Sequence, residues 1–160
     1  MKFNIVSDTQ IIIFLNKNYV SDINFKDKDE LEDYFRFLFL NLKKNYNINF
    51  SGYYIINVYL DKYYGSVIEL EKEEFEYYDS FTNQVDMRIS VIDSNFLYEI
   101  EDPYFLDNLD NFKIYTYKNK FYLQIEKDIS NIQISNIVEH SNIVYSDTED
   151  IIYKSELVTI

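Results

Sequence analysis

The chain has 160 residues, a formal net charge of −13 and 19% aromatic residues, but only two glycines, one histidine and no cysteine. The lack of cysteine excludes disulfides, thiolate nucleophiles and cysteine-based metal centres. Two glycines are too few for a glycine-rich phosphate loop or a dinucleotide-binding motif. The surplus of acid disfavours contact with nucleic-acid phosphates or an anionic membrane. We therefore expect an acidic, soluble domain that binds without catalysing a reaction and needs no cofactor.

Short strands and one long helix are predicted in the first third of the chain. Apolar and β-branched residues at 3–5 and 11–15 predict two strands. Asp27 can cap a helix, with Glu30 three residues later in a capping-box pattern, and the helix is expected over about residues 28–46. The residues that share its apolar face are Leu31, Tyr34, Phe35, Leu38, Leu42 and Tyr46. Phe37, Phe39 and Leu40 widen this stripe, which predicts a helix covered on more than one side.

A hairpin and further strands are predicted in the middle of the chain. Residues 53–60 and 66–71 read as paired strands, with Gly65 supplying a positive φ in the turn. The charged run 69–79 is expected to leave the sheet as a loop or a short helical turn. Alternating residues then predict strands at 85–91 and 96–100.

The pattern weakens after residue 100. Pro103 and the Asp- and Asn-rich residues up to Asn111 form a candidate subdomain boundary, with one helical turn near Phe105. Residues 112–117 and 121–126 predict a second hairpin, with Asn119 in its turn. Beyond it we expect a short helix near 134–138 and a strand at 143–145, while residues 151–153 fit either type.

The order of these elements predicts an α+β fold. Strands cluster along the chain instead of alternating with helices, which indicates a mostly antiparallel sheet with one long amphipathic helix (about 28–46) and a weaker C-terminal helix. The length fits a single compact domain over 1–160, with a division into 1–79 and 80–160 as the alternative. The N-terminal residues lack an apolar run of signal length, so we expect a cytoplasmic protein that does not cross a membrane.

Few residues offer catalytic or metal-binding chemistry. His140 is the sole histidine, and although Glu139 lies beside it, no motif surrounds the pair, so a structural or exposed histidine is expected. The carboxylates Asp147, Glu149 and Asp150 could contact a cation through oxygen, as could Asp107 and Asp110. Neither group has the central glycine of a calcium loop, so solvated loops and no metal site are expected.

The tyrosines point to contact with another protein. Tyrosine is a common anchor of protein interfaces, and stacking on a nucleic acid would require a basic groove. We expect Tyr115, Tyr117 and Tyr122 of the second hairpin to bind a partner. An acidic stretch would steer a partner with a basic surface, and its expected contributors are Glu71, Glu73, Glu74 and Glu76.

The stretch Phe112–Glu126 resembles the aromatic hairpin in the C-terminal domain of MecA-type adaptors, which hand substrates to Clp-family ATPase–protease machines. The N-terminal order of strands, the helix at 29–46 and the hairpin at 53–71 is similar to that family as well. The resemblance covers about two-thirds of the chain and rests on layout plus one hairpin, without a specific motif. The family's longer charged linker is missing here. The resemblance implies an adaptor that presents partners to a Clp-type machine.

Two other classes of function remain open. An acidic inhibitor that mimics nucleic acid would bind a basic enzyme, with a steep dependence on salt. A small enzyme that uses carboxylates would need a concave site holding a carboxylate of perturbed pKa. The leading hypothesis is a non-enzymatic interaction protein.

Overall fold

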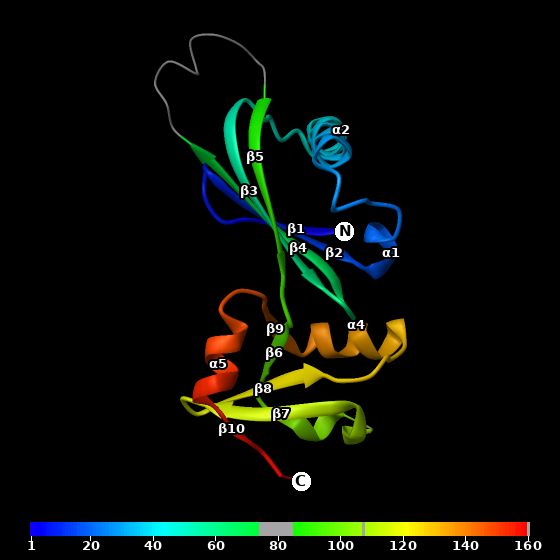
Figure 1. The fold of residues 1–160 in the computed structure, drawn as a ribbon, viewed down its shortest axis with the longest axis vertical. Helices are drawn as coiled ribbons and strands as arrows, with labels where there is room; N and C mark the ends of the chain where they lie inside the picture. The colour runs from blue at the N-terminus through cyan, green and yellow to red at the C-terminus, as the bar shows by residue number, and fades with distance from the viewer. Residues whose placement is uncertain (74–84, 107, 160) are drawn as a thin grey trace. The chain divides into compact units, whose positions relative to one another are not determined.

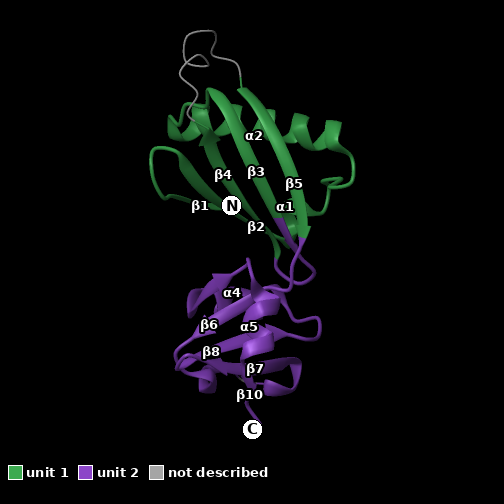
Figure 2. Cartoon of the chain, turned by 60° about the vertical axis from the view of Figure 1, so that its left-hand side comes forward, with its two compact units in different colours: residues 1–58, 65–92 green, residues 59–64, 93–160 purple. Residues whose placement is uncertain are grey.

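The computed structural model describes residues 1–73, 85–106 and 108–159 and confirms an α+β fold with antiparallel sheets (Figure 1). The chain forms two compact units (Figure 2). Unit 1 comprises residues 1–58 and 65–92, and unit 2 comprises residues 59–64 and 93–160. Each unit is built around one five-stranded sheet.

The sheet of unit 1 has the strand order β1-β2-β4-β3-β5. Its strands are β1 (Lys2–Ile5), β2 (Gln10–Asn16), β3 (Gly52–Asp61), β4 (Gly65–Glu73) and β5 (Val85–Asp93). β1 pairs with β2, and β2 with β4, both antiparallel, with Ile13 opposite Ile68. The helix α1 (Lys17–Val20) follows β2, and the long helix α2 (Lys28–Tyr46) follows α1.

Capping residues at both ends, Asp27 and Asn47, set the bounds of α2. The Asp27 carboxylate accepts hydrogen bonds from the backbone N–H groups of Asp29 and Glu30, at 3.0 and 3.3 Å. These bonds satisfy donors that a helix leaves open at its first turn. At the other end Asn47 adopts φ 56°, and its N–H donates to the carbonyls of Leu42 and Lys43. The predicted bounds of 28–46 are therefore confirmed.

The core of unit 1 lies between α2 and one face of the sheet, which α2 crosses (Figure 2). The helix buries Leu31, Phe35, Leu38, Phe39 and Leu42, and the sheet buries Ile13, Leu15, Ile56, Val58, Ile68 and Leu70. Burial of such a side chain contributes roughly 1.5–3 kcal/mol. Phe37 and Leu40 remain 63% and 66% exposed, so the prediction that these two residues are covered is wrong.

Gly65 is required at the start of β4. Its φ is 130°, a region that residues with a side chain rarely adopt, as predicted for the turn. A Cβ atom at this position would also lie 2.4 Å from the Leu15 carbonyl oxygen. The close approach of β4 to the end of β2 therefore requires a residue without a side chain at position 65.

The sheet of unit 2 has the strand order β10-β7-β8-β6-β9. Its strands are β6 (Leu97–Ile100), β7 (Phe112–Tyr117), β8 (Lys120–Ile125), β9 (Ser141–Val144) and β10 (Glu156–Leu157). Two 3-10 helices, η1 (Pro103–Phe105) and η2 (Leu109–Asn111), precede β7. The helices α4 (Asn131–Glu139) and α5 (Thr148–Lys154) flank β9 in the chain.

The Asp61 carboxylate organises the start of unit 2. One of its oxygens accepts hydrogen bonds from the backbone N–H groups of Tyr63 and Tyr64, at 2.9 and 2.8 Å. The other oxygen accepts from the N–H of Phe96 at 2.9 Å. The Tyr64 ring then lies 5.9 Å from the Phe96 ring, and both are buried. One side chain thus joins the turn 61–64 to the segment that leads into β6.

The division of the chain differs from the position 79/80 considered above. β5 adds to the edge of the unit 1 sheet beside β3, so unit 1 continues to residue 92. The region around Pro103 is interior to unit 2, not a boundary. Pro103 is buried, and the Asn111 carbonyl accepts a hydrogen bond from the N–H of Glu126. The charged run remains in strand β4 as far as Glu73, and residues 74–79 lie outside the described residues.

No helix within the described residues is both long and apolar enough to cross a membrane.

We predict that Asp61→Ala lowers the free energy of unfolding by about 2–4 kcal/mol, because backbone donors at three positions lose a charged acceptor. Urea unfolding followed by circular dichroism measures the change. Asp110→Ala is the matched control, since the Asp110 side chain is exposed. Equal stability of the two variants would contradict this role of Asp61.

We also predict that the protein loses stability in alkali. Burial raises the pKa of Tyr64 from 10.0 to about 12, so the folded state holds its proton more tightly than the unfolded chain. The stabilisation is complete below pH 10 and disappears as the pH rises from 10 to about 12. Urea unfolding at several pH values should show this loss, and Tyr64→Phe should make it smaller without abolishing it, because burial also raises the pKa of Tyr98. An equal slope in Tyr64→Phe would contradict the prediction.

Candidate interaction surface

The hairpin of β7 and β8 has two different faces. In the turn, Lys118 and Asn119 adopt φ values of 49° and 62°, which suit a tight two-residue hairpin turn. The register places Ile114 opposite Leu123, and both are buried. Tyr115 lies opposite Tyr122, and alternation along β7 puts Tyr117 on the same face. The fold therefore brings the three predicted tyrosines together.

The three tyrosines differ in burial. Tyr122 is 7% exposed and belongs to the core of unit 2, whereas Tyr115 and Tyr117 are half-buried. β8 lies between β7 and β6, so neighbouring strands cover both of its edges. β7 has on its outer side the two-residue strand β10. The expectation that Tyr122 is a surface anchor is therefore corrected, and Tyr115 and Tyr117 remain accessible.

Leu157 extends this surface. It pairs with Tyr115 in the antiparallel register of β10 and β7, and it is 57% exposed. We call the set formed by Tyr115, Tyr117 and Leu157 the β7 surface. Sequence reasoning missed Leu157, because a two-residue strand carries no periodic signal.

Polar groups hold the rings of the β7 surface in place. The Tyr115 hydroxyl donates to Gln124 Oε1 at 3.1 Å. The Lys118 Nζ lies 5.2 Å from the centroid of the Tyr117 ring, within reach of a cation–π interaction. The Tyr117 hydroxyl has no hydrogen-bond partner among the described residues, so it can bond to a partner.

Three lysines around the hairpin form ion pairs with nearby acidic side chains. Lys113 Nζ lies 3.1 Å from Glu126 Oε1, and Lys120 Nζ lies 3.1 Å from Glu99 Oε1. A hydrogen bond to the neighbouring glutamate raises the pKa of each lysine. Similarly, Asp150 raises the pKa of Lys154, and their charged atoms lie 3.0 Å apart. The β7 surface is therefore surrounded by charges of both signs, most of them in ion pairs.

The two predicted acidic residues that the structure describes belong to unit 1. Glu71 and Glu73 lie in β4, which belongs to unit 1, with Glu71 exposed opposite Gln10. Glu74 and Glu76 lie outside the described residues. The β7 surface is therefore described from residues of unit 2 alone.

His140 lines an open hollow of about 740 Å³ in unit 2. Its Nδ1 lies 2.8 Å from the Asn136 carbonyl oxygen, and its ring stacks on Phe105 with centroids 5.1 Å apart. Two carboxylates of the lining have other roles, because Glu99 pairs with Lys120 and Asp102 accepts a hydrogen bond from the N–H of Tyr104. His140 is exposed, and its contacts fit the structural histidine expected above.

Metal-binding groups are not assembled in the part of the chain that the structure describes, since it holds no cluster of three or more His, Asp or Glu side chains suited to a metal ion. Of the carboxylates considered above, Asp150 pairs with Lys154 and Asp107 lies outside the described residues.

We predict that Tyr122→Ser lowers the free energy of unfolding by about 3 kcal/mol, because it empties a buried aromatic site. Tyr117→Ser should cost less than about 1 kcal/mol, since its ring is half-exposed. Thermal or urea unfolding distinguishes the two. Equal losses would place Tyr117 in the core and remove it from the interaction surface.

Comparisons of the chain with protein families, curated proteins and solved structures found no match.

Proposed function

We propose that this protein is a non-catalytic protein-interaction module that contacts a partner through the β7 surface of unit 2. The observation that carries the proposal is the alignment of Tyr115, Tyr117 and Leu157 on one side of the sheet, next to its outermost strand. The buried residues Ile114 and Leu123 pack on the opposite face of the hairpin, and Tyr122 is buried beside Tyr115 on the same face, so the sheet that carries the surface is held rigid. A binding surface on a rigid scaffold loses little conformational entropy on association.

The energetics of such a contact come mainly from the rings. An aromatic anchor at the centre of an interface contributes about 2 kcal/mol or more when a partner covers it. Lys113, Lys120 and Lys154 already pair with Glu126, Glu99 and Asp150, so these three lysines add little long-range attraction. We therefore expect an affinity that changes little with salt, unlike that of an acidic mimic of nucleic acid.

The specific form that we propose is an adaptor for a Clp-type ATPase–protease machine. It is supported by the resemblance of the aromatic hairpin at 112–126 to that of MecA-type adaptors. An adaptor needs binding surfaces and no reaction centre, and the contacts of His140 with the Asn136 carbonyl and the Phe105 ring fit a structural role for that histidine. The net charge of −13 favours a partner with a basic surface. The lack of cysteine fits a cytoplasmic setting shared with the protease.

We predict that the double variant Tyr115→Ser/Tyr117→Ser weakens binding to a purified Clp-type ATPase by at least about 30-fold, because two anchors are lost. Fluorescence anisotropy with labelled protein measures the affinity. Circular dichroism must show the wild-type spectrum in the variant.

Tyr104→Ser is the matched control, since Tyr104 is 80% exposed, lies in unit 2 and is outside the β7 surface. Its affinity should equal that of the wild type. Unchanged binding in the double variant would reject the β7 surface, and no binding by the wild type would reject the adaptor. A loss of affinity of tenfold or more between about 0.1 and 0.5 M salt would favour the acidic mimic instead.

A further inference from the structure

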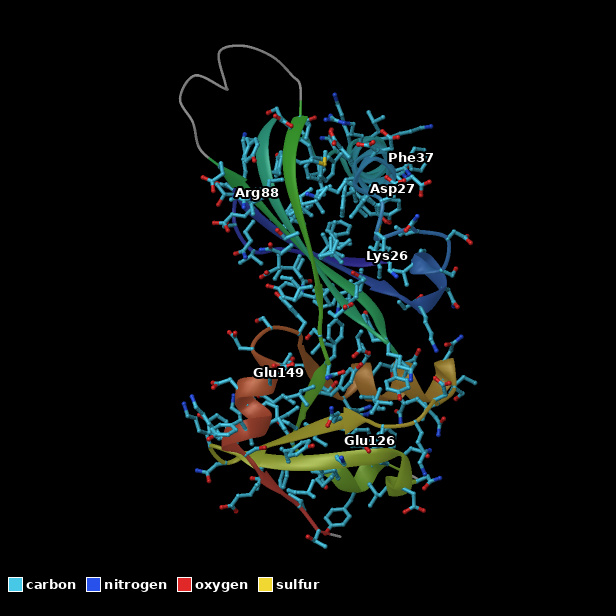
Figure 3. The ribbon with its side chains drawn as sticks, viewed as in Figure 1. Lys26, Asp27, Phe37, Arg88, Glu126 and Glu149 are labelled. Atoms are coloured by element: carbon cyan, nitrogen blue, oxygen red, sulfur yellow. The ribbon has the colours of Figure 1, made fainter. Side chains whose placement is uncertain are left out.

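The outer side of α2 carries an apolar pair that the core of unit 1 does not use. Phe37 and Leu40 are 63% and 66% exposed, although the same helix buries five apolar residues against the sheet. Figure 3 shows Phe37 directed away from the strands. Two large apolar side chains three positions apart lie side by side on a helix and form a continuous patch.

Charged residues of opposite sign flank this pair along the same line of the helix. Asp33 precedes Phe37 by four positions, and Lys44 follows Leu40 by four. Both charged residues are exposed, and neither has an ion-pair partner within the described part of the chain. Arg36, beside this line, is already paired with Glu32 at 2.7 Å. We call Asp33, Phe37, Leu40 and Lys44 the α2 stripe.

The spacing of the α2 stripe is the same in both directions. Its intervals are four, three and four residues, which is the spacing of one contact line in a pair of packed helices. When a second α2 is laid antiparallel with Phe37 opposite Leu40, Asp33 falls opposite Lys44. The two-fold axis repeats both contacts, so the stripe is complementary to itself in shape and in charge.

We propose that α2 mediates an antiparallel homodimer, in which the α2 stripe of one chain packs on that of a second copy. The partner is inferred from the charges: the stripe presents an acid, an apolar pair and a base in an order that its own reversed copy matches. A parallel pair would place Asp33 against Asp33 and Lys44 against Lys44, which repel each other. This interface is formed by residues other than those of the β7 surface.

The dimer is expected to be weak and reversible. A single pair of helices buries less surface than a standard stable interface of about 1,600 Å², so a dissociation constant in the micromolar range is expected. The apolar pair supplies most of the attraction. The two ion pairs select the orientation, because exposed pairs contribute little affinity by themselves.

Sedimentation velocity of the full chain over a range of concentrations tests the proposal. The wild type should change from monomer to dimer as its concentration rises, and Phe37→Ser/Leu40→Ser should weaken association at least about tenfold. Ile132→Ser, at an 83% exposed site in unit 2, is the control and should leave the dissociation constant unchanged. Circular dichroism confirms the fold of each variant.

Charge reversal tests the orientation. Asp33→Lys and Lys44→Asp should each weaken the dimer about fivefold or more, because each creates two like-charge contacts. The double variant Asp33→Lys/Lys44→Asp should restore it, and a one-to-one mixture of the single variants should form the mixed dimer. Asp8→Lys, which makes the same charge change at an exposed site off the helix, should have no such effect.

Three results would overturn the proposal. The first is a wild type that stays monomeric up to about 0.5 mM, well above a micromolar dissociation constant. The second is a dimer that the Phe37→Ser/Leu40→Ser change leaves intact. The third is a dimer that the single reversals weaken but the double reversal does not restore, which would mean that Asp33 and Lys44 do not face each other.

Discussion

Unit 2 depends on the carboxylate of Asp61. Its two oxygens accept hydrogen bonds from the backbone of Tyr63, Tyr64 and Phe96, so a turn and a segment 35 residues later are held by one side chain. Hydrogen bonds to a charged acceptor are stronger than neutral ones, and the donors would be costly to leave unpaired. The segment from Phe96 into β6 is placed by these bonds, and β6 is the strand on which β8 and β9 assemble.

The aromatic content follows from this arrangement. Tyr64, Phe96 and Tyr98 are buried close to Asp61, and desolvation together with the charge of Asp61 raises the pKa of Tyr98 well above its usual value. The Tyr98 hydroxyl is buried without a hydrogen-bond partner among the described residues. A neutral tyrosine tolerates that position better than its anion does. Many aromatic side chains are therefore part of the core, so fewer are available to contact a partner than the aromatic content of the sequence suggests.

The two proposed interfaces share one physical feature. In each, an element with a buried side presents apolar residues on its other side or at its edge. These residues are Phe37 and Leu40 on α2, and Tyr115 and Tyr117 on β7 with Leu157 on the neighbouring β10. The burial of the inner side fixes the element, so the outer residues are presented in one geometry. Binding at such a surface costs little further order, which is what an interaction module requires.

The sequence by itself determined the elements whose signals are local. Helical spacing and the Asp27 cap predicted α2 to within its observed bounds, and alternation predicted the β3–β4 and β7–β8 hairpins, with Gly65 and Asn119 in their turns. These signals are contained within a few neighbouring residues, because a helix or a hairpin forms its own hydrogen bonds.

Only the tertiary structure decided which residues each element covers. Tyr115 and Tyr122 look alike in the sequence, but Tyr122 lies on a strand enclosed by β6 and β7, while Tyr115 lies beside the short strand β10 from the distant segment 156–157. Likewise, the helical pattern could not show that Phe39 is buried and that Phe37 is exposed, since the chain around both is apolar. Burial depends on neighbours that are remote in the chain, and one sequence read locally does not specify them.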